Sequence, residues 1–252
     1  IMVYVPLGRT GVYHAQAMLR MIASELPDPE RIATARQLLD NLPDSNWLKH
    51  NPYVGDHIDQ GNSGLYDLLL HRRDRAYSVP ELAGLMQQGG MRPANFVEPA
   101  RYEPGVYLRD AALVQRLHNL NWVERCSFSE LLAGNMKTHI IYAIRDDNPA
   151  NTIAVPDTPE TVPVMRDDDG PSLAQQIKPG MSLKIDMEGV KLSLPLPDLS
   201  TDILARIDGA RSLAAIHAEM DPALEWDAFK RQFDRLYGSF YGLSLMFLRK
   251  PV

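Results

Sequence analysis

Ile1-Met2-Val3-Tyr4-Val5-Pro6-Leu7-Gly8-Arg9-Thr10-Gly11-Val12-Tyr13 opens the sequence and decides the fold class. Its first residues are apolar and partly β-branched, which is typical of a buried strand. Proline and glycine then supply a turn, and the apolar residues of 12–26 follow a helical period. Strand, loop and helix in this order indicate an α/β domain. Because no cap or turn precedes the strand, we expect it inside a parallel sheet whose earlier strands belong to sequence upstream of residue 1.

The composition indicates a globular chain and argues against several classes of function. The 252 residues are 45% hydrophobic and 23% charged, which allows a real core in one or two domains. The net charge of -6 argues against a nucleic-acid partner, because binding phosphates requires clustered Lys and Arg. Cys126 is the only cysteine, which excludes a disulfide framework within the chain. Without a long apolar run or a signal-peptide pattern, we expect a cytoplasmic protein with no membrane partner.

Helical and strand-like patterns alternate as far as residue 147. Helices are predicted over 12–26, 30–42, 65–70 and 78–88, and over 111–132 with a break near 125–128. Ser78 and Glu81 have the spacing of a capping box. Met91–Val97 is predicted as a strand, and Lys137–Arg145 as a well-buried one. Residues 44–63 are polar and weakly periodic, which indicates a long loop of the kind that is often functional.

A change of composition over 146–171 predicts a linker or meander between the first domain and a second one at 148–252. Residues 181–196 alternate around Glu188–Gly189 and predict a hairpin. Three short helices over 199–207, 213–220 and 226–240, followed by a strand over 243–248, complete a winged-helix-like pattern. From Asp198 onward the sequence has eight acids and seven bases, which is unfavourable for duplex binding. Aromatic and leucine residues at helical spacing predict core in the last helix: Trp226, Phe229, Phe233, Leu236, Tyr237 and Phe240.

Residues 1–145 resemble a known family in the order and spacing of three motifs. Met2–Tyr13 is similar to the fifth strand and following loop of a bacterial class I S-adenosylmethionine-dependent methyltransferase. Tyr77–Met91 is similar to the last helix and sixth strand, and His139–Arg145 resembles the seventh strand. The resemblance implies an α/β fold class: the C-terminal half of a Rossmann-like methyltransferase sheet with helical insertions at 1–147, followed by a small α+β winged-helix-like domain at 148–252.

The resemblance implies methyl transfer to a small-molecule or peptide acceptor, with this chain supplying the substrate side. It also implies S-adenosylmethionine as cofactor, held mainly by sequence missing from this chain. The Gly8–Gly11 spacing fits neither a dinucleotide fingerprint nor a P-loop, so no cofactor-binding residue is assigned and the chain alone is expected to be inactive. The alternative is a non-catalytic binding or dimerisation module that lacks the methyl-donor site. A homodimer is possible under both.

Ligands of open α/β sheets bind beyond the carboxyl ends of the strands, so the acceptor is expected near the loop after Val5. Tyr13 and His14 are the candidate catalytic residues, with His14 as a base. Tyr4 and Arg9 are candidate substrate-binding residues, since a guanidinium can clamp an acidic group. The alternative is that Arg9 and His14 cap and pair on a loop surface.

A second group of polar residues follows and could form a lid over the substrate. Its candidate substrate-binding residues are Asn62, Tyr66 and His71. The neighbouring acids are Asp56, Asp59, Asp67 and Asp74. A metal-dependent hydrolase would instead use His50, Asp56, His57 and His71. No HExxH-like spacing places two of these ligands on one helical face, so we expect no metal site.

Overall fold

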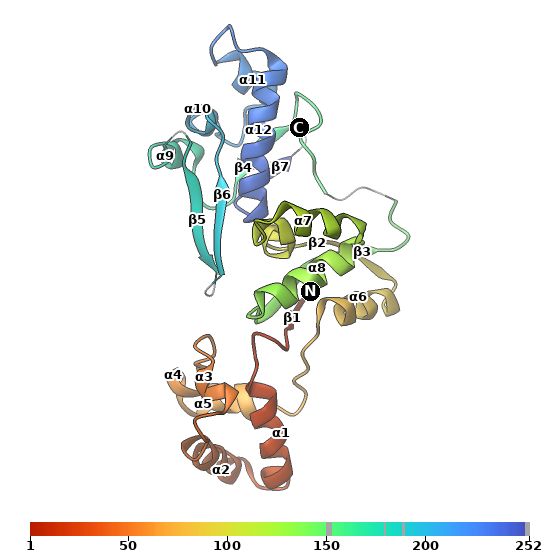
Figure 1. Ribbon diagram of the computed structural model, residues 1–252, viewed down its shortest axis with the longest axis vertical. Coiled ribbons are helices and arrows are strands. Elements are labelled where there is room, and N and C mark those ends of the chain that lie inside the picture. Colours follow the sequence, from red (N-terminus) through yellow and green to blue (C-terminus); the bar gives the residue numbers. More distant parts are fainter. Residues whose placement is uncertain (150–152, 179, 188–189, 250–252) are drawn as a thin grey trace. The chain divides into compact units, whose positions relative to one another are not determined.

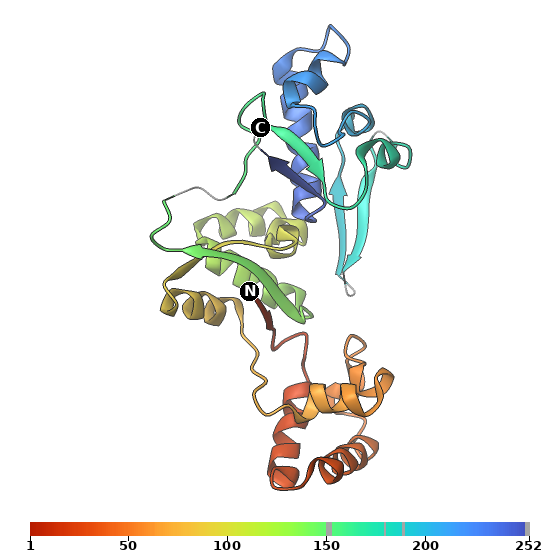
Figure 2. The same cartoon turned by 180° about the vertical axis from the view of Figure 1, so that it is seen from behind.

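The computed structural model describes residues 1–149, 153–178, 180–187 and 190–249 (Figures 1 and 2). It divides into two compact units: Ile1–Leu82 with Glu130–Ile140, and Ala83–Ser129 with Ile141–Val252. The limits of these units differ from the predicted domain boundary at residue 147. That boundary stays a prediction. Within the described ranges, no helix is both long and apolar enough to cross a membrane.

Strands β1 (Met2–Tyr4), β2 (Met91–Phe96) and β3 (Thr138–Arg145) form one sheet in the order β1-β3-β2. β3 runs antiparallel to both neighbours. β1 is therefore an edge strand, and on its other side the described residues add a single parallel bridge, Tyr4 to Ala76. The predicted strand is present, and its extended pairing within the described chain is antiparallel, to β3, with Met2 61% exposed. Parallel neighbours contributed by sequence upstream of residue 1 stay a prediction.

β3 is buried on one face only. His139 and Ile141 are buried, whereas Ile140, which lies between them, and Tyr142, which follows Ile141, are exposed. Because successive side chains of a strand point to opposite faces, this alternation leaves one face of β3 open to solvent. The prediction of a well-buried strand over Lys137–Arg145 is therefore half right: the strand is present, but its apolar centre is not covered on both sides.

Helices make up most of the first unit. They are α1 (Val12–Ala23), α2 (Asp28–Asp40), α3 (Trp47–His50), α4 (Asp56–Asp59) and α5 (Gly61–Leu65), followed by a π-helical turn, Tyr66–Leu70. The prediction of one long loop over 44–63 is wrong, because α3, α4 and the start of α5 lie in it. Figures 1 and 2 show α2 to α5 grouped on one side of α1.

One face of α1 carries the core of the first unit. Its buried residues are Val12, Ala15, Gln16, Leu19 and Ala23. Of these, Val12, Ala15 and Leu19 pack in one cluster with core residues of the segments that follow, which include Ala35, Leu48, Leu65 and Leu69. Ile22, predicted to be in this stripe, is exposed, and Gln16 is buried in its place. A polar side chain therefore enters the core and needs an internal partner.

Between the two parts of the first unit, the chain forms α6 (Val79–Gln88), β2, α7 (Ala111–Arg116) and α8 (Trp122–Ala133), with 3-10 turns at Pro99–Tyr102, Pro104–Val106 and Leu117–Asn119. The predicted cap of α6 is present in part: Glu81 Oε2 accepts from Ser78 N at 2.8 Å. Leu85, predicted to be buried, is exposed. The helix break lies before Trp122, not near 125–128, because Asn121 and Glu124 cap α8 reciprocally.

The second unit has two strand pairs and four further helices. β5 (Ser182–Met187) and β6 (Val190–Pro195) form the predicted hairpin, with Ile185 opposite Leu192. Its predicted turn at Glu188–Gly189 lies outside the described residues. β4 (Val162–Met165) pairs with β7 (Met246–Arg249). The helices are α9 (Gly170–Ala174), α10 (Ser200–Leu204), α11 (Leu213–Ala218) and α12 (Trp226–Gly242). Of the predicted linker or meander over 146–171, the linker reading is thus wrong where β4 and the start of α9 lie.

The aromatic face of α12 forms the core of the second unit, as its spacing predicted. Phe229, Phe233 and Phe240 are fully buried, and Leu236 and Tyr237 join the same cluster. In both views α12 lies between the β4–β7 pair and the β5–β6 hairpin (Figures 1 and 2). Three helices and a hairpin are present; their assignment as a winged helix stays a prediction.

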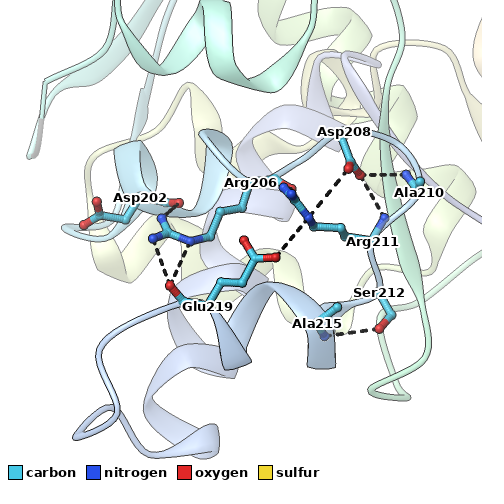
Figure 3. A network of polar contacts seen from close by, with 8 residues as sticks. All are labelled: Asp202, Arg206, Asp208, Ala210, Arg211, Ser212, Ala215 and Glu219. Carbon is cyan, nitrogen blue, oxygen red and sulfur yellow. Dashed lines mark hydrogen bonds and ion pairs between the residues drawn. The ribbon is translucent and has the colours of Figure 1, made fainter.

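A polar network holds the turn between α10 and α11 (Figure 3). Arg206 donates to Asp202 O at 2.8 Å and to Glu219 O at 3.0 Å. Arg211 Nε lies 3.1 Å from Glu219 Oε1. Asp208 accepts two backbone hydrogen bonds across the turn, the first of them from Arg211 N, and these bonds lower the pKa of its carboxyl group. The charges of this turn are therefore used to stabilise it.

Candidate functional site

Arg9 lies in a closed polar cluster at the end of β1. Its Nη2 atom is 2.9 Å from Asp74 Oδ2, and the two side chains are 7% and 5% exposed. The guanidinium carbon lies 3.7 Å from the centroid of the Tyr4 ring, within the range of a cation–π contact. Gln16 donates Nε2 to the same Asp74 oxygen and to Leu68 O, each at 2.8 Å. The guanidinium that was predicted to clamp a substrate is therefore already paired with an internal carboxylate.

Tyr13 belongs to this cluster and is half-buried beside Arg9. Burial raises the pKa of its phenol to about 12, although the Arg9 guanidinium acts in the opposite direction. The Tyr13 hydroxyl makes no well-formed hydrogen bond to any residue that the structure describes, and the same holds for Arg9 Nε and Asp74 Oδ1. A neutral phenol of such high pKa is a poor base near neutral pH. It can position a group, but it does not readily remove a proton.

His14 lies apart from the Tyr4–Arg9–Tyr13 cluster. It is the next residue after Tyr13 on α1, but it is exposed, and no hydrogen bond or ion pair joins it to the described residues. The structure thus brings three of the four predicted residues of this region together and leaves the fourth in solvent. Its role as a catalytic base stays a prediction.

The glycine-containing loop after β1 does not fit the methyl donor. A Cβ atom at Gly8 would overlap the carbonyl of Met136, and one at Gly11 would overlap the backbone of Leu48. These glycines therefore allow the chain's own backbone to come close, and leave no cradle for a ligand. Asn51 fixes the loop from outside by donating Nδ2 to Gly8 O at 3.0 Å and to Thr10 O at 3.2 Å. We derive no catalytic step through S-adenosylmethionine in this chain.

An open cavity of about 310 Å³ lies beside this loop. Leu7 and Thr10 line it from the loop, and Trp47 and Tyr53 line it from α3 and the segment that follows. Trp47 is 61% exposed, which is unusual for a residue of this size, so its ring is available to a ligand. Sequence reasoning missed both aromatic residues, although a tryptophan within a loop predicted to be functional was a signal.

Asn62 and Tyr66 form hydrogen bonds with arginine side chains of α2. Asn62 Oδ1 accepts from Arg36 Nη2 at 2.6 Å. Tyr66 lies 3.2 Å from Arg31 Nη1 and donates to Asp28 Oδ1 at 3.2 Å. These bonds tie α5 and the π-helical turn to α2. Both side chains therefore have structural partners, and their predicted contacts with substrate stay predictions.

His71 and the hydrolase residues do not form a metal site in the described part of the chain. His71 is exposed and its Nδ1 accepts from Arg73 N at 3.2 Å. The described residues contain no group of three or more His, Cys, Asp or Glu side chains that could hold a metal ion. For His57, burial lowers the pKa of the imidazole. The hydrolase alternative, which needs His50, Asp56, His57 and His71 together, therefore has no support from this geometry.

No family model matches the sequence. Among solved structures, the fold is similar to that of PKMT2 from Rickettsia typhi, with a TM-score of 0.51 and 11% identity over 98% of this chain and 50% of that one. It is also similar to PKMT2 from Rickettsia typhi in complex with AdoHcy, with a TM-score of 0.52 and 11% identity over 98% of this chain and 51% of that one. The chain thus spans about half the length of these methyltransferase structures and has a methyltransferase-like fold.

Proposed function

We propose that this chain is the substrate-side, C-terminal part of an S-adenosylmethionine-dependent methyltransferase. The observation that carries the proposal is the fold match, which covers 98% of this chain with half of PKMT2. PKMT2 binds AdoHcy, the molecule that S-adenosylmethionine becomes when its methyl group is transferred. The outer edge of β1 adds support, because its single bridge to Ala76 leaves backbone groups at Met2 and Val3 available for a further strand.

We place the methyl donor on sequence outside this chain, because the loop after β1 is filled by the chain's own backbone. What these residues supply is the acceptor side. Methyl transfer from a sulfonium needs alignment of donor and acceptor more than acid–base chemistry. The high pKa of Tyr13 and the exposed position of His14 are therefore compatible with the reaction.

We propose a peptide lysine as the acceptor, held in the cavity beside the loop. PKMT2 is a protein-lysine methyltransferase. Independently, Trp47 and Tyr53 offer aromatic surface that suits the aliphatic stem of a lysine and its terminal ammonium group. That ammonium group must lose a proton to solvent before the neutral amine attacks the methyl group and the thioether AdoHcy leaves. A small-molecule amine of the same shape would satisfy the same contacts.

Calorimetry on the isolated chain tests both parts of the proposal. Titration with S-adenosylmethionine should give no binding heat, and tight binding would refute the assignment of the donor site to other sequence. A lysine peptide should bind, and Trp47→Ala should weaken its binding severalfold, whereas His14→Ala, a control that also removes an exposed ring, should not. A protein extended upstream should carry a Gly-rich loop and transfer a labelled methyl group. If it transfers none, the chain is instead a non-catalytic binding module.

A further inference from the structure

The second unit contains a cavity of its own, with a volume of about 700 Å³. That volume is in the range that holds a drug-sized ligand. The cavity lies between the Asn95–Cys126 region, the end of β6 and the last turns of α12, all of which belong to the second unit. The fold and the proposed methyl transfer do not account for it.

The walls of the cavity are aromatic, apolar and fixed in place. Tyr102 stacks on Phe96 with 3.7 Å between the ring centroids, and Trp122 stacks on Phe96 at 5.4 Å. The hydroxyl of Tyr241, which also lines the cavity, accepts a hydrogen bond from Asn95 Nδ2 at 2.8 Å. Both Tyr102 and Trp122 line the cavity, and Trp122 is 37% exposed. Such a wall suits a flat aromatic body, because offset stacking adds to the area that is buried.

Gly238 is the second feature that points to a ligand. It lies in the interior of α12, where glycine is less stable than alanine. Gly242, one turn later, has a packing reason, since its Cβ atom would lie 3.2 Å from Ala100 Cβ. At Gly238 a Cβ atom would meet nothing within 4 Å, and the residue lines the cavity. The missing side chain therefore leaves the cavity open, although the protein's own packing does not require a glycine there.

The charges of the cavity are unequal. Arg125 forms an ion pair with Glu103, and both line the cavity as a neutral pair. Arg235 also lines it, and no hydrogen bond or ion pair joins its guanidinium to any residue in the described ranges. On the same helix, Lys230 pairs with Asp234 at 2.6 Å, which leaves Arg235 as the cationic group of the lining that has no acidic partner in the described ranges. The Arg235 end of the cavity is therefore positive and suits an anion.

We propose that this cavity binds a small aromatic monocarboxylate. Its ring lies against the Tyr102 and Trp122 wall beside Gly238, and its carboxylate pairs with the Arg235 guanidinium. Cys126, which lines the same cavity, takes no part in chemistry near neutral pH, because burial raises the pKa of its thiol to about 12. The inference is independent of the proposed methyl transfer.

Calorimetric titration of the full chain with naphthylacetate and with naphthylethanol tests the proposal. The two probes share an aromatic body and differ in the carboxylate. We expect naphthylacetate to bind about three- to tenfold more tightly at low salt, as for a partly exposed ion pair, and to lose this advantage at high salt. No binding of naphthylacetate, or equal binding of both probes, would overturn the proposal.

Three variants locate the site. Gly238→Phe should fill the cavity and abolish binding of both probes, while Gly238→Ala, which stabilises the helix and leaves most of the volume, should retain binding. Arg235→Gln should weaken naphthylacetate to the affinity of naphthylethanol and leave naphthylethanol unchanged. Circular dichroism confirms that each variant is folded. Unaltered naphthylacetate binding by a folded Gly238→Phe or Arg235→Gln protein would place the ligand elsewhere and refute the inference.

Discussion

Replacing Asp74 with alanine should destabilise the first unit strongly, because it leaves the Arg9 guanidinium buried without a counter-ion. Breaking a buried ion pair on one side costs about 3–5 kcal/mol. The Tyr4 ring remains 3.7 Å from the guanidinium, and a desolvated cation–π contact can retain about 2 kcal/mol of stabilisation. Gln16 loses one acceptor but keeps Leu68 O at 2.8 Å. We therefore expect a loss near the lower end of the range, about 3 kcal/mol.

Asp28→Ala is the matched control in the same unit. Asp28 pairs with Arg31 at 3.0 Å, but the Asp28 side chain is 62% exposed. After its removal Arg31 still donates to Leu70 O at 2.7 Å. The Arg31 side chain is as buried as that of Arg9, at 7% exposed, but its carboxylate partner is solvated and Tyr66 Oη, at 3.2 Å from Arg31 Nη1, stays as a second acceptor. We therefore expect a smaller loss of stability than for Asp74→Ala, about 1 kcal/mol.

Native-state amide exchange of the α1 residues in increasing urea measures both losses, because it reads the first unit separately from the second. If Asp74→Ala and Asp28→Ala had equal opening free energies, the argument that burial of both partners makes the Arg9–Asp74 pair contribute more to stability would be refuted. If Asp74→Ala is too unstable to purify, Asp74→Asn keeps the side-chain shape and removes only the charge. It should still lose more stability than Asp28→Asn.

Three further predictions concern single groups. Burial raises the pKa of Tyr13 from 10.0 to about 12, so the stability that its neutral phenol contributes is complete below pH 10 and declines as the pH rises toward 12. Tyr13→Phe should therefore lose less unfolding free energy between pH 10 and pH 12 than the parent does, as measured by urea unfolding. Ser212 Oγ accepts from Ala215 N at 3.2 Å, and Ser212→Ala should lower the stability of the second unit by about 1 kcal/mol, whereas no change would mean that the cap is unimportant. Phe233→Ala should cost about 3–5 kcal/mol in chemical unfolding, and a smaller loss would indicate that the core refills the space.

Local patterns were enough to predict the second unit's hairpin and its last helix. Alternation fixes which residues of β5 and β6 share a face, and the observed pairing of Ile185 with Leu192 follows from it. The aromatic spacing of α12 likewise matches the buried face. The break before α8 could have been predicted as well, since Asn121 and Glu124 have the spacing of a capping box.

Pairing between distant segments could not be predicted in this way. β4, which lies in the predicted linker or meander, was missed because its partner β7 lies at the other end of the chain. Alternation of residues in a short strand does not identify the strand with which it pairs. The same limit applies to the Arg9 cluster. Tyr4, Arg9 and Tyr13 are close in sequence and were expected together, but Asp74, which neutralises Arg9, is 65 residues away. Gln16 in an apolar stripe was the one local signal that a buried polar partner existed.

The Arg9 cluster also shows that polar side chains with reactive groups contribute to the stability of the first unit. Arg9 and Tyr66 have the functional groups of a binding site, yet each is held by a carboxylate of the same unit, Asp74 and Asp28 respectively. A reaction that needed a strong base or an anion clamp would require these groups to be free. Methyl transfer from a sulfonium requires instead that an acceptor be held in line, which an open aromatic cavity beside a fixed loop can do. Residues that sequence reasoning selected for reactivity thus stabilise the first unit, and Trp47 is the residue whose loss should weaken binding of the acceptor that we propose.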